Sequence, residues 1–180
     1  PYSYSWSPSG STSQTATGLN SGTHTVFVAD AKGCSYSVSV FLTQPSPLTA
    51  ITGYTSPLCN TGADGMAWVF ASGGSPPYAY TWSPFGGSND TALNMTAGIY
   101  SVMVTDNQSC QMVSMVNISQ PPPLTIAITN FSDVNCFGGS NGYAIASVSG
   151  GTPPYTYSWE NGVTSPANTN LSEGVYYITV

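Results

Sequence analysis

Few side chains in this sequence could carry out chemistry, and they stand apart from one another. The seven acidic residues fall singly, mostly in segments expected to be turns: Asp30, Asp64, Asp90, Asp106, Asp133, Glu160 and Glu173. Hydrolytic acid–base catalysis needs two such groups held close together with separated pKa values. The single histidine, His24, has no adjacent serine or cysteine nucleophile to activate. We therefore predict no catalytic residue and no enzyme.

Cofactor and metal sites are not expected either. The Gly-Gly pairs match neither a P-loop nor a dinucleotide-binding fingerprint. Calcium is an alternative at Asp30, Asp64 and Asp106, but Ca²⁺ takes roughly six or more oxygen ligands and each of these turns has one acid. We interpret the three aspartates as turn-forming residues.

The cysteines suggest where the protein works. Cys34, Cys59, Cys110 and Cys136 form no C-x-x-C motif, and one histidine cannot complete a zinc-type cluster. Cysteines that recur at fixed spacing predict disulfides and therefore an oxidising, extracellular compartment.

Charge excludes two classes of partner. Charged residues make up 4% of the chain, and Lys32 is the only basic one. A single cation can neutralise neither a row of nucleic-acid phosphates nor an anionic membrane surface. No apolar run approaches the length of a transmembrane helix, so direct membrane insertion is not expected. A polar, nearly neutral surface suits a protein that is coated with sugar or packed into an assembly.

The sequence repeats itself with an offset of 76 or 77 residues. Three segments show this most clearly: Pro1-Tyr-Ser-Tyr-Ser-Trp6, Pro77-Tyr-Ala-Tyr-Thr-Trp82 and Pro154-Tyr-Thr-Tyr-Ser-Trp159. The repeat defines a first copy at residues 1–46, which is the C-terminal part of a module, a complete copy at 47–122, and a third copy at 123–180, which is the N-terminal part of a module. We expect the chain to be a segment of a longer array, in which the neighbouring repeats are its main partners.

The complete copy is predicted to contain about seven short strands separated by turns. In residues 66–72, alternation places Ala67, Val69 and Ala71 on one face and Met66, Trp68 and Phe70 on the other. The tryptophan of the third strand and the Gly-x-Tyr that opens the penultimate strand fit a compact Ig-like sandwich with a tyrosine corner. His24 takes the tyrosine place in the first copy. The expected fold is all-β, with tandem Ig-like sandwich modules arranged head to tail.

These motifs resemble the SprB-type repeat of Bacteroidota surface adhesins, a relative of PKD-like and Ig-like domains. The matching features are Gly-Gly-Ser/Thr-Pro-Pro-Tyr-x-Tyr-x-Trp, the Asp that precedes a cysteine by four residues, and the terminal Gln-Pro. Ser109 departs from the usual glycine before the cysteine. The resemblance implies a large cell-surface protein, linked in gliding bacteria to adhesion and motility and typically exported by the type IX system. It supplies no ligand, because the motifs are structural.

Covalent glycans are the expected modification. Asn-x-Ser/Thr sequons occur at six positions: Asn89, Asn94, Asn107, Asn117, Asn130 and Asn170. Asn94 and Asn170 occupy the same place in successive copies. Asp90-Thr91-Ala92 also resembles the O-glycosylation pattern of Bacteroidota, which makes Thr91 a candidate.

Cysteine pairing has two alternatives. In an Ig-like copy, Cys59 and Cys110 would lie at opposite ends, roughly 25–30 Å apart, whereas a disulfide needs Cα atoms within about 7 Å. We expect Cys59 to pair with a cysteine after residue 180, and Cys110 with one before residue 1. These disulfides would cross-link neighbouring copies covalently. The alternative pairs Cys34 with Cys59 and Cys110 with Cys136 across a hairpin at the linker.

The leading hypothesis is a glycosylated structural region of an extracellular filament or cell-surface adhesin stalk, which acts as a stiff spacer, with identical chains in a fibre as further partners. The alternative is a set of carbohydrate-binding accessory modules of a secreted enzyme, with Trp68 and Phe70 as the aromatic platform. The equivalent residues of the third copy are Ile145 and Ser147, so such a platform does not repeat.

Overall fold

The computed structural model describes all 180 residues, which form antiparallel β-strands joined by turns and loops, with no helix. Consequently no helix is present that could cross a membrane. The chain divides into two compact units, Pro1–Pro47 and Leu48–Val180. Strands rich in β-branched and aromatic residues end at Gly, Pro and Asn turns, and the expected all-β class is confirmed.

The first unit contains one antiparallel sheet of order β1-β2-β3. Its strands are β1 (Ser3–Ser7), β2 (Gly22–Ala29) and β3 (Ser35–Leu42). Strands β2 and β3 pair along their full length, from Gly22 opposite Leu42 to Ala29 opposite Ser35. A tight turn joins them, closed by a 3.0 Å hydrogen bond from the Asp30 N–H to the Cys34 carbonyl.

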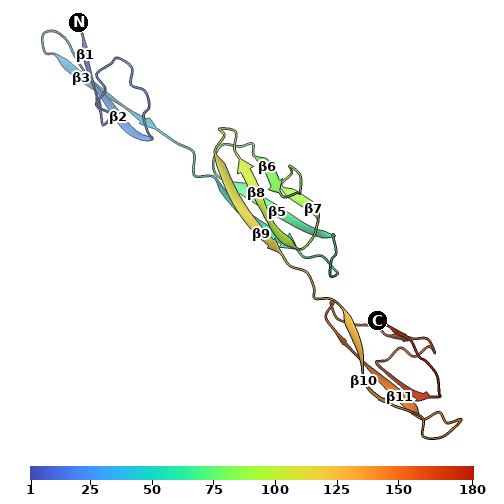
Figure 1. The fold of residues 1–180 in the computed structure, drawn as a ribbon. Coiled ribbons are helices and arrows are strands. Elements are labelled where there is room, and N and C mark those ends of the chain that lie inside the picture. The colour runs from blue at the N-terminus through green and yellow to red at the C-terminus, as the bar shows by residue number, and fades with distance from the viewer. The chain divides into compact units, whose positions relative to one another are not determined.

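The complete copy is a sandwich of two three-stranded sheets, shown in the middle of Figure 1. Its strands are β4 (Thr49–Thr55), β5 (Gly65–Ser72), β6 (Ala79–Ser83), β7 (Thr91–Met95), β8 (Gly98–Thr105) and β9 (Gln111–Ile118). The sheet orders are β4-β5-β7 and β6-β8-β9. These orders match the A-B-E and C-F-G sheets of an immunoglobulin domain. The Ig-like sandwich is therefore confirmed by the strand topology.

The core of the complete copy lies between its two sheets. One face of β5 is buried through Ala67, Val69 and Ala71, as the alternation predicts, and β8 contributes Val102 and Val104. Trp82 on β6 is also buried in this cluster, and its indole Nε1 donates a hydrogen bond to the Asn89 carbonyl at 2.9 Å. The indole therefore fills the core while its one polar atom remains satisfied.

The complete copy has six strands, where about seven are predicted from the sequence. The segment between β6 and β7 holds Pro84, Gly86 and Gly87, and both glycines have positive φ values of 135° and 83°. Such backbone angles interrupt an extended strand, and this segment forms turns and bends instead. No strand equivalent to D of an immunoglobulin domain forms, so β7 is an edge strand that pairs with β5 alone.

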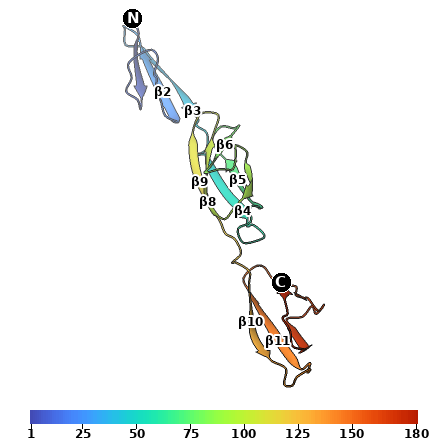
Figure 2. The same ribbon diagram turned by 45° about the vertical axis from the view of Figure 1, so that its right-hand side comes forward.

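The third copy, at the lower end of Figure 2, repeats this plan as far as residue 180. Its strands are β10 (Thr125–Ser132), β11 (Gly142–Ser149), β12 (Ser158–Trp159), β13 (Ala167–Leu171) and β14 (Ile178–Thr179). The sheet β10-β11-β13 corresponds to β4-β5-β7, and β12-β14 corresponds to part of β6-β8. Trp159, Ala146 and Leu171 are buried where Trp82, Val69 and Met95 lie in the complete copy.

Candidate functional site

Asp106, which recurs as Asp30, holds a turn by accepting backbone hydrogen bonds. Its carboxylate accepts the N–H groups of Gln108 at 2.9 Å and Cys110 at 2.8 Å within the β8–β9 turn, and that of Ser75 at 2.9 Å from the loop after β5. Burial by itself would raise the pKa of Asp106, but the hydrogen bonds from Ser75, Cys110 and Gln108 outweigh burial and lower this pKa. The side chain thus ties two distant loops together.

A tyrosine corner is present at the start of β8. The Tyr100 hydroxyl donates to the Thr96 carbonyl at 3.2 Å, and Tyr176 makes the same 3.2 Å bond to the Ser172 carbonyl. The His24 Nε2 lies 2.8 Å from the Asn20 carbonyl, four residues upstream as in the other two copies. The interpretation of His24 as a tyrosine substitute is therefore confirmed.

The Gln-Pro that ends the complete copy binds the loop between its first two strands. The Gln120 Oε1 accepts the Thr61 N–H at 3.0 Å, and the Asn60 Nδ2 donates to the Pro121 carbonyl at 3.0 Å. On the other side of the linker, the Gly151 N–H donates to the Pro122 carbonyl at 2.8 Å. The linker is thus hydrogen-bonded to both the complete copy and the third copy.

The four cysteines are exposed, and no two of them are bonded to each other. Cys59 lies in the β4–β5 loop, at the end of the copy from which β9 leaves, since Ser56 and Ser119 are hydrogen-bonded at 3.2 Å. Cys110 lies in the β8–β9 turn at the opposite end. The hairpin required for local pairing of Cys110 with Cys136 is not formed, because β9 pairs with β8 and β10 pairs with β11. Cysteine pairing stays a prediction, which peptide mapping under non-reducing conditions decides.

All six predicted sequon asparagines are exposed: Asn89, Asn94, Asn107, Asn117, Asn130 and Asn170. Asn94 and Asn170 share a left-handed backbone, with φ values of 58° and 59°, at the ends of β7 and β13. Thr91 is half-buried, and its hydroxyl donates to the Asp90 Oδ1 at 3.1 Å. The structure does not bring these residues together into one site.

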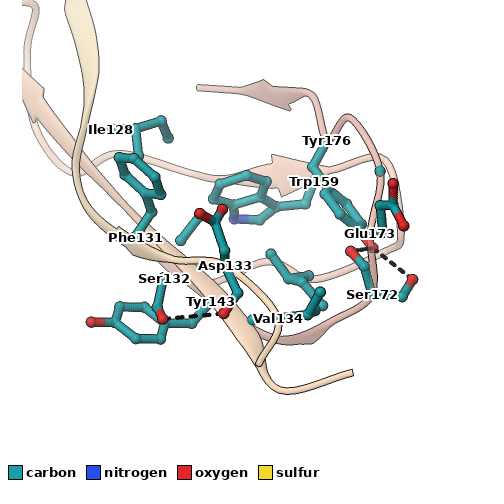
Figure 3. Close-up of a pocket in the computed structure, with 14 residues that line it drawn as sticks. Ile128, Phe131, Ser132, Asp133, Val134, Tyr143, Trp159, Ser172, Glu173 and Tyr176 are labelled. Atoms are coloured by element: carbon teal, nitrogen blue, oxygen red, sulfur yellow. Dashed lines mark hydrogen bonds between the residues drawn. The ribbon is translucent and has the colours of Figure 1, made fainter. Parts of the chain in front are cut away.

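The cavity in Figure 3 lies inside the third copy and has a volume of about 450 Å³. Ile128, Trp159, Leu171 and Tyr176 line it. In the complete copy, the equivalents of Trp159 and Leu171 are Trp82 and Met95, and both are buried in the core between the two sheets. The cavity is therefore sandwich interior rather than a ligand site. No group of three or more His, Cys, Asp or Glu side chains could hold a metal ion.

Comparison with solved structures gives only loose matches. The three N-terminal domains of the bacteriophage RB49 outer capsid protein Hoc match at 16% identity and TM-score 0.45, covering 93% of this chain and 69% of that one. Eight Ig domains of Down Syndrome Cell Adhesion Molecule match at 17% identity and TM-score 0.35, covering 88% and 27%. A Dscam isoform-specificity structure matches at 18% identity and TM-score 0.35, and this chain spans 38% of its length.

Comparison with protein families is more specific. No curated protein matches the chain. A family model of the SprB repeat matches residues 52–87 and 128–164. Each matched segment includes a Gly-Gly-Ser/Thr-Pro-Pro motif, at 73–77 and 150–154, and the two lie at equivalent places in successive copies. The resemblance found in the sequence is confirmed at these two segments, which are similar to the SprB repeat.

Proposed function

We propose that these repeats are a stiff spacer in a longer surface adhesin or extracellular filament, carrying covalent glycans. Ig-like copies in series add length, and an array of this kind is stabilised by each copy and by its contacts with the next. A chain with 4% charged residues and exposed sequons suits an extracellular, glycan-bearing stalk. Neighbouring repeats, and identical chains in a fibre, are the proposed partners.

The observation that supports stiffness most directly is the hydrogen-bonded linker between the complete copy and the third copy. Three consecutive prolines, Pro121, Pro122 and Pro123, each have a fixed φ. On one side Asn60 donates to the Pro121 carbonyl and Thr61 donates to the Gln120 side chain, and on the other side Gly151 donates to the Pro122 carbonyl. Each such bond contributes about 1 kcal/mol net. Together with the prolines, these bonds restrict rotation of one copy against the next.

Residual dipolar couplings measured by NMR on the 180-residue chain test this proposal. The complete copy and the third copy are expected to share one alignment tensor, because a restricted linker makes them tumble together. The double variant Asn60→Ala/Gln120→Ala is expected to give the two copies different tensors. Gln44→Ala is the matched control, since its side chain binds Ser21 within the first unit. Two different tensors in the unmodified chain would refute the stiff spacer.

A further inference from the structure

One face of the complete copy exposes a cluster of large apolar side chains. They lie on the outer side of the β4-β5-β7 sheet: Ile51 (72% exposed), Trp68 (38%), Phe70 (68%) and Leu93 (62%). Ile51 stands directly opposite Phe70, and Met66 opposite Leu93, so the cluster is continuous across the three strands. This outer cluster is not part of the core and is not used by the spacer role.

Trp68 is held flat against the sheet at the centre of the outer cluster. It stands opposite Gly53 on β4, and a Cβ added to Gly53 would lie 2.5 Å from the indole Cζ2. The indole therefore occupies the space that a side chain at residue 53 would fill. A ring that covers a glycine in this way leaves its other π-face on the solvent side, where a flat ligand can stack on it.

A polar groove of about 510 Å³ adjoins the outer cluster at the edge strand β7. Tyr78, Tyr80, Asn89, Asp90, Thr91 and Leu93 line it. Leu93 belongs to both features, and Thr91 stands directly opposite Trp68 in the β5–β7 pairing. The groove and the indole are thus adjacent parts of one surface.

The polar groups of this groove are largely free to bind a ligand. The Tyr80 hydroxyl and the Asn89 side chain make no hydrogen bond within the protein, and the Asp90 carboxylate accepts only the Thr91 hydroxyl. Burial and then the nearby Asp90 charge raise the pKa of Tyr80, which keeps the hydroxyl protonated and able to donate. Carboxylate, amide and phenol groups can together donate to and accept from ligand hydroxyls.

An exposed aromatic ring next to unpaired hydrogen-bonding groups is the chemistry that recognises a sugar. The C–H face of a pyranose stacks on an indole, while its hydroxyls bond to the neighbouring polar groups. The single carboxylate, in a chain of net charge −6, disfavours an acidic sugar by repulsion. We propose that the outer cluster and the adjoining polar groove of the complete copy bind a neutral oligosaccharide. One sugar ring stacks on Trp68, and sugar hydroxyls bond to Asp90 and Tyr80.

The third copy lacks this surface and therefore serves as an internal control. Ile145 stands opposite Ala167, at the places of Trp68 and Thr91. In the complete copy, the Val69 N–H donates to the Asp90 carbonyl. In the third copy, the equivalent Ala146 N–H donates to the Pro166 carbonyl, so Pro166 takes the place of Asp90. The proposed site is a single one on the complete copy. It goes beyond the spacer role and does not depend on it.

The test uses the 180-residue chain produced without glycosylation, so that Asn89 and Thr91 are bare. It is applied to an array of neutral gluco-, xylo- and manno-oligosaccharides together with acidic oligogalacturonates, and hits are titrated by calorimetry. A neutral oligosaccharide is expected to bind, with affinity at least tenfold weaker in Trp68→Ala and in Asp90→Asn. Phe41→Ala, which removes an even more exposed aromatic ring (68%) in the first unit, is the control and should bind as the unmodified chain does.

Gly53→Ala provides a second variant, because its methyl group displaces the indole without removing it; binding is expected to weaken here too. Failure of every neutral oligosaccharide to bind overturns the proposal, as does equal binding by Trp68→Ala. Self-association that Trp68→Ala abolishes, without any sugar binding, would assign the surface to contacts between chains instead. Neither result would alter the alignment tensors that test the spacer.

Discussion

At the scale of single residues, the repeated polar side chains hold turns in place. Asp106 connects Ser75 to the β8–β9 turn, and the Tyr100 hydroxyl donates to the Thr96 carbonyl in the turn that precedes β8. The motif that suggested calcium is thus satisfied by backbone N–H groups. The Tyr78 hydroxyl likewise donates to the Gly73 carbonyl at 2.6 Å, which explains why Gly-Gly and Tyr recur together.

Asp106→Asn is expected to change how stability depends on pH. Because the folded-state pKa of Asp106 is lowered, its stabilising effect is complete above the unfolded-state pKa and is lost as pH falls through the folded value. The free energy of unfolding, measured by denaturant titration between pH 2 and 7, should fall at acidic pH and fall less steeply in Asp106→Asn. Asp133→Asn, at an exposed turn, is the control. Parallel pH profiles for Asp106→Asn and the unmodified chain would contradict this role.

At the scale of elements, alternation along each strand decides which side chains enter the core. The faces predicted for β5 are the faces observed, and β8 shows the same alternation of buried and more exposed side chains. About seven strands are predicted for the complete copy and six form; glycines with positive φ lie between β6 and β7, where no strand forms. Local pattern therefore predicts faces better than it predicts the number of strands, because a turn depends on backbone angles that residue alternation does not reveal.

Two isoleucines provide a matched test of these faces. Ile118 on β9 is 1% exposed and Ile99 on β8 is 68% exposed, so the same substitution removes the same atoms from opposite environments. Ile118→Ala should lower the free energy of unfolding by about 2–5 kcal/mol. Ile99→Ala should change it by less than about 0.5 kcal/mol. Chemical denaturation followed by tryptophan fluorescence checks both; equal losses would mean that β9 does not pack as described.

At the scale of the whole molecule, the repeat of 76 or 77 residues and the exposed sequons are consistent with an array of repeats that carries glycans. Asn94 and Asn170 have the same backbone conformation, are both exposed and precede the same glycine turn. An enzyme that modifies one is therefore expected to accept the other.

Tandem mass spectrometry of protein from its native source tests glycosylation. Peptides that contain Asn94 and Asn170 are expected to carry glycan, whereas the peptide with Asn161, which is exposed but outside any sequon, should be unmodified. Bare peptides at all six sequons and at Thr91 would remove glycosylation from the proposed function. A protein mass that deglycosylation leaves unchanged would count against glycosylation in the same way.

The sequence by itself determined the period, the all-β class, the buried faces and the tyrosine corner with its His24 variant. Each of these follows from spacing within one strand or between copies, which a linear pattern records. The tertiary structure decided the contacts between distant segments: Ser75 with Asp106, Thr61 with Gln120, and the Trp68 indole over Gly53. Such contacts depend on which strands pair and on how the two sheets close, so they become visible only when the chain is folded.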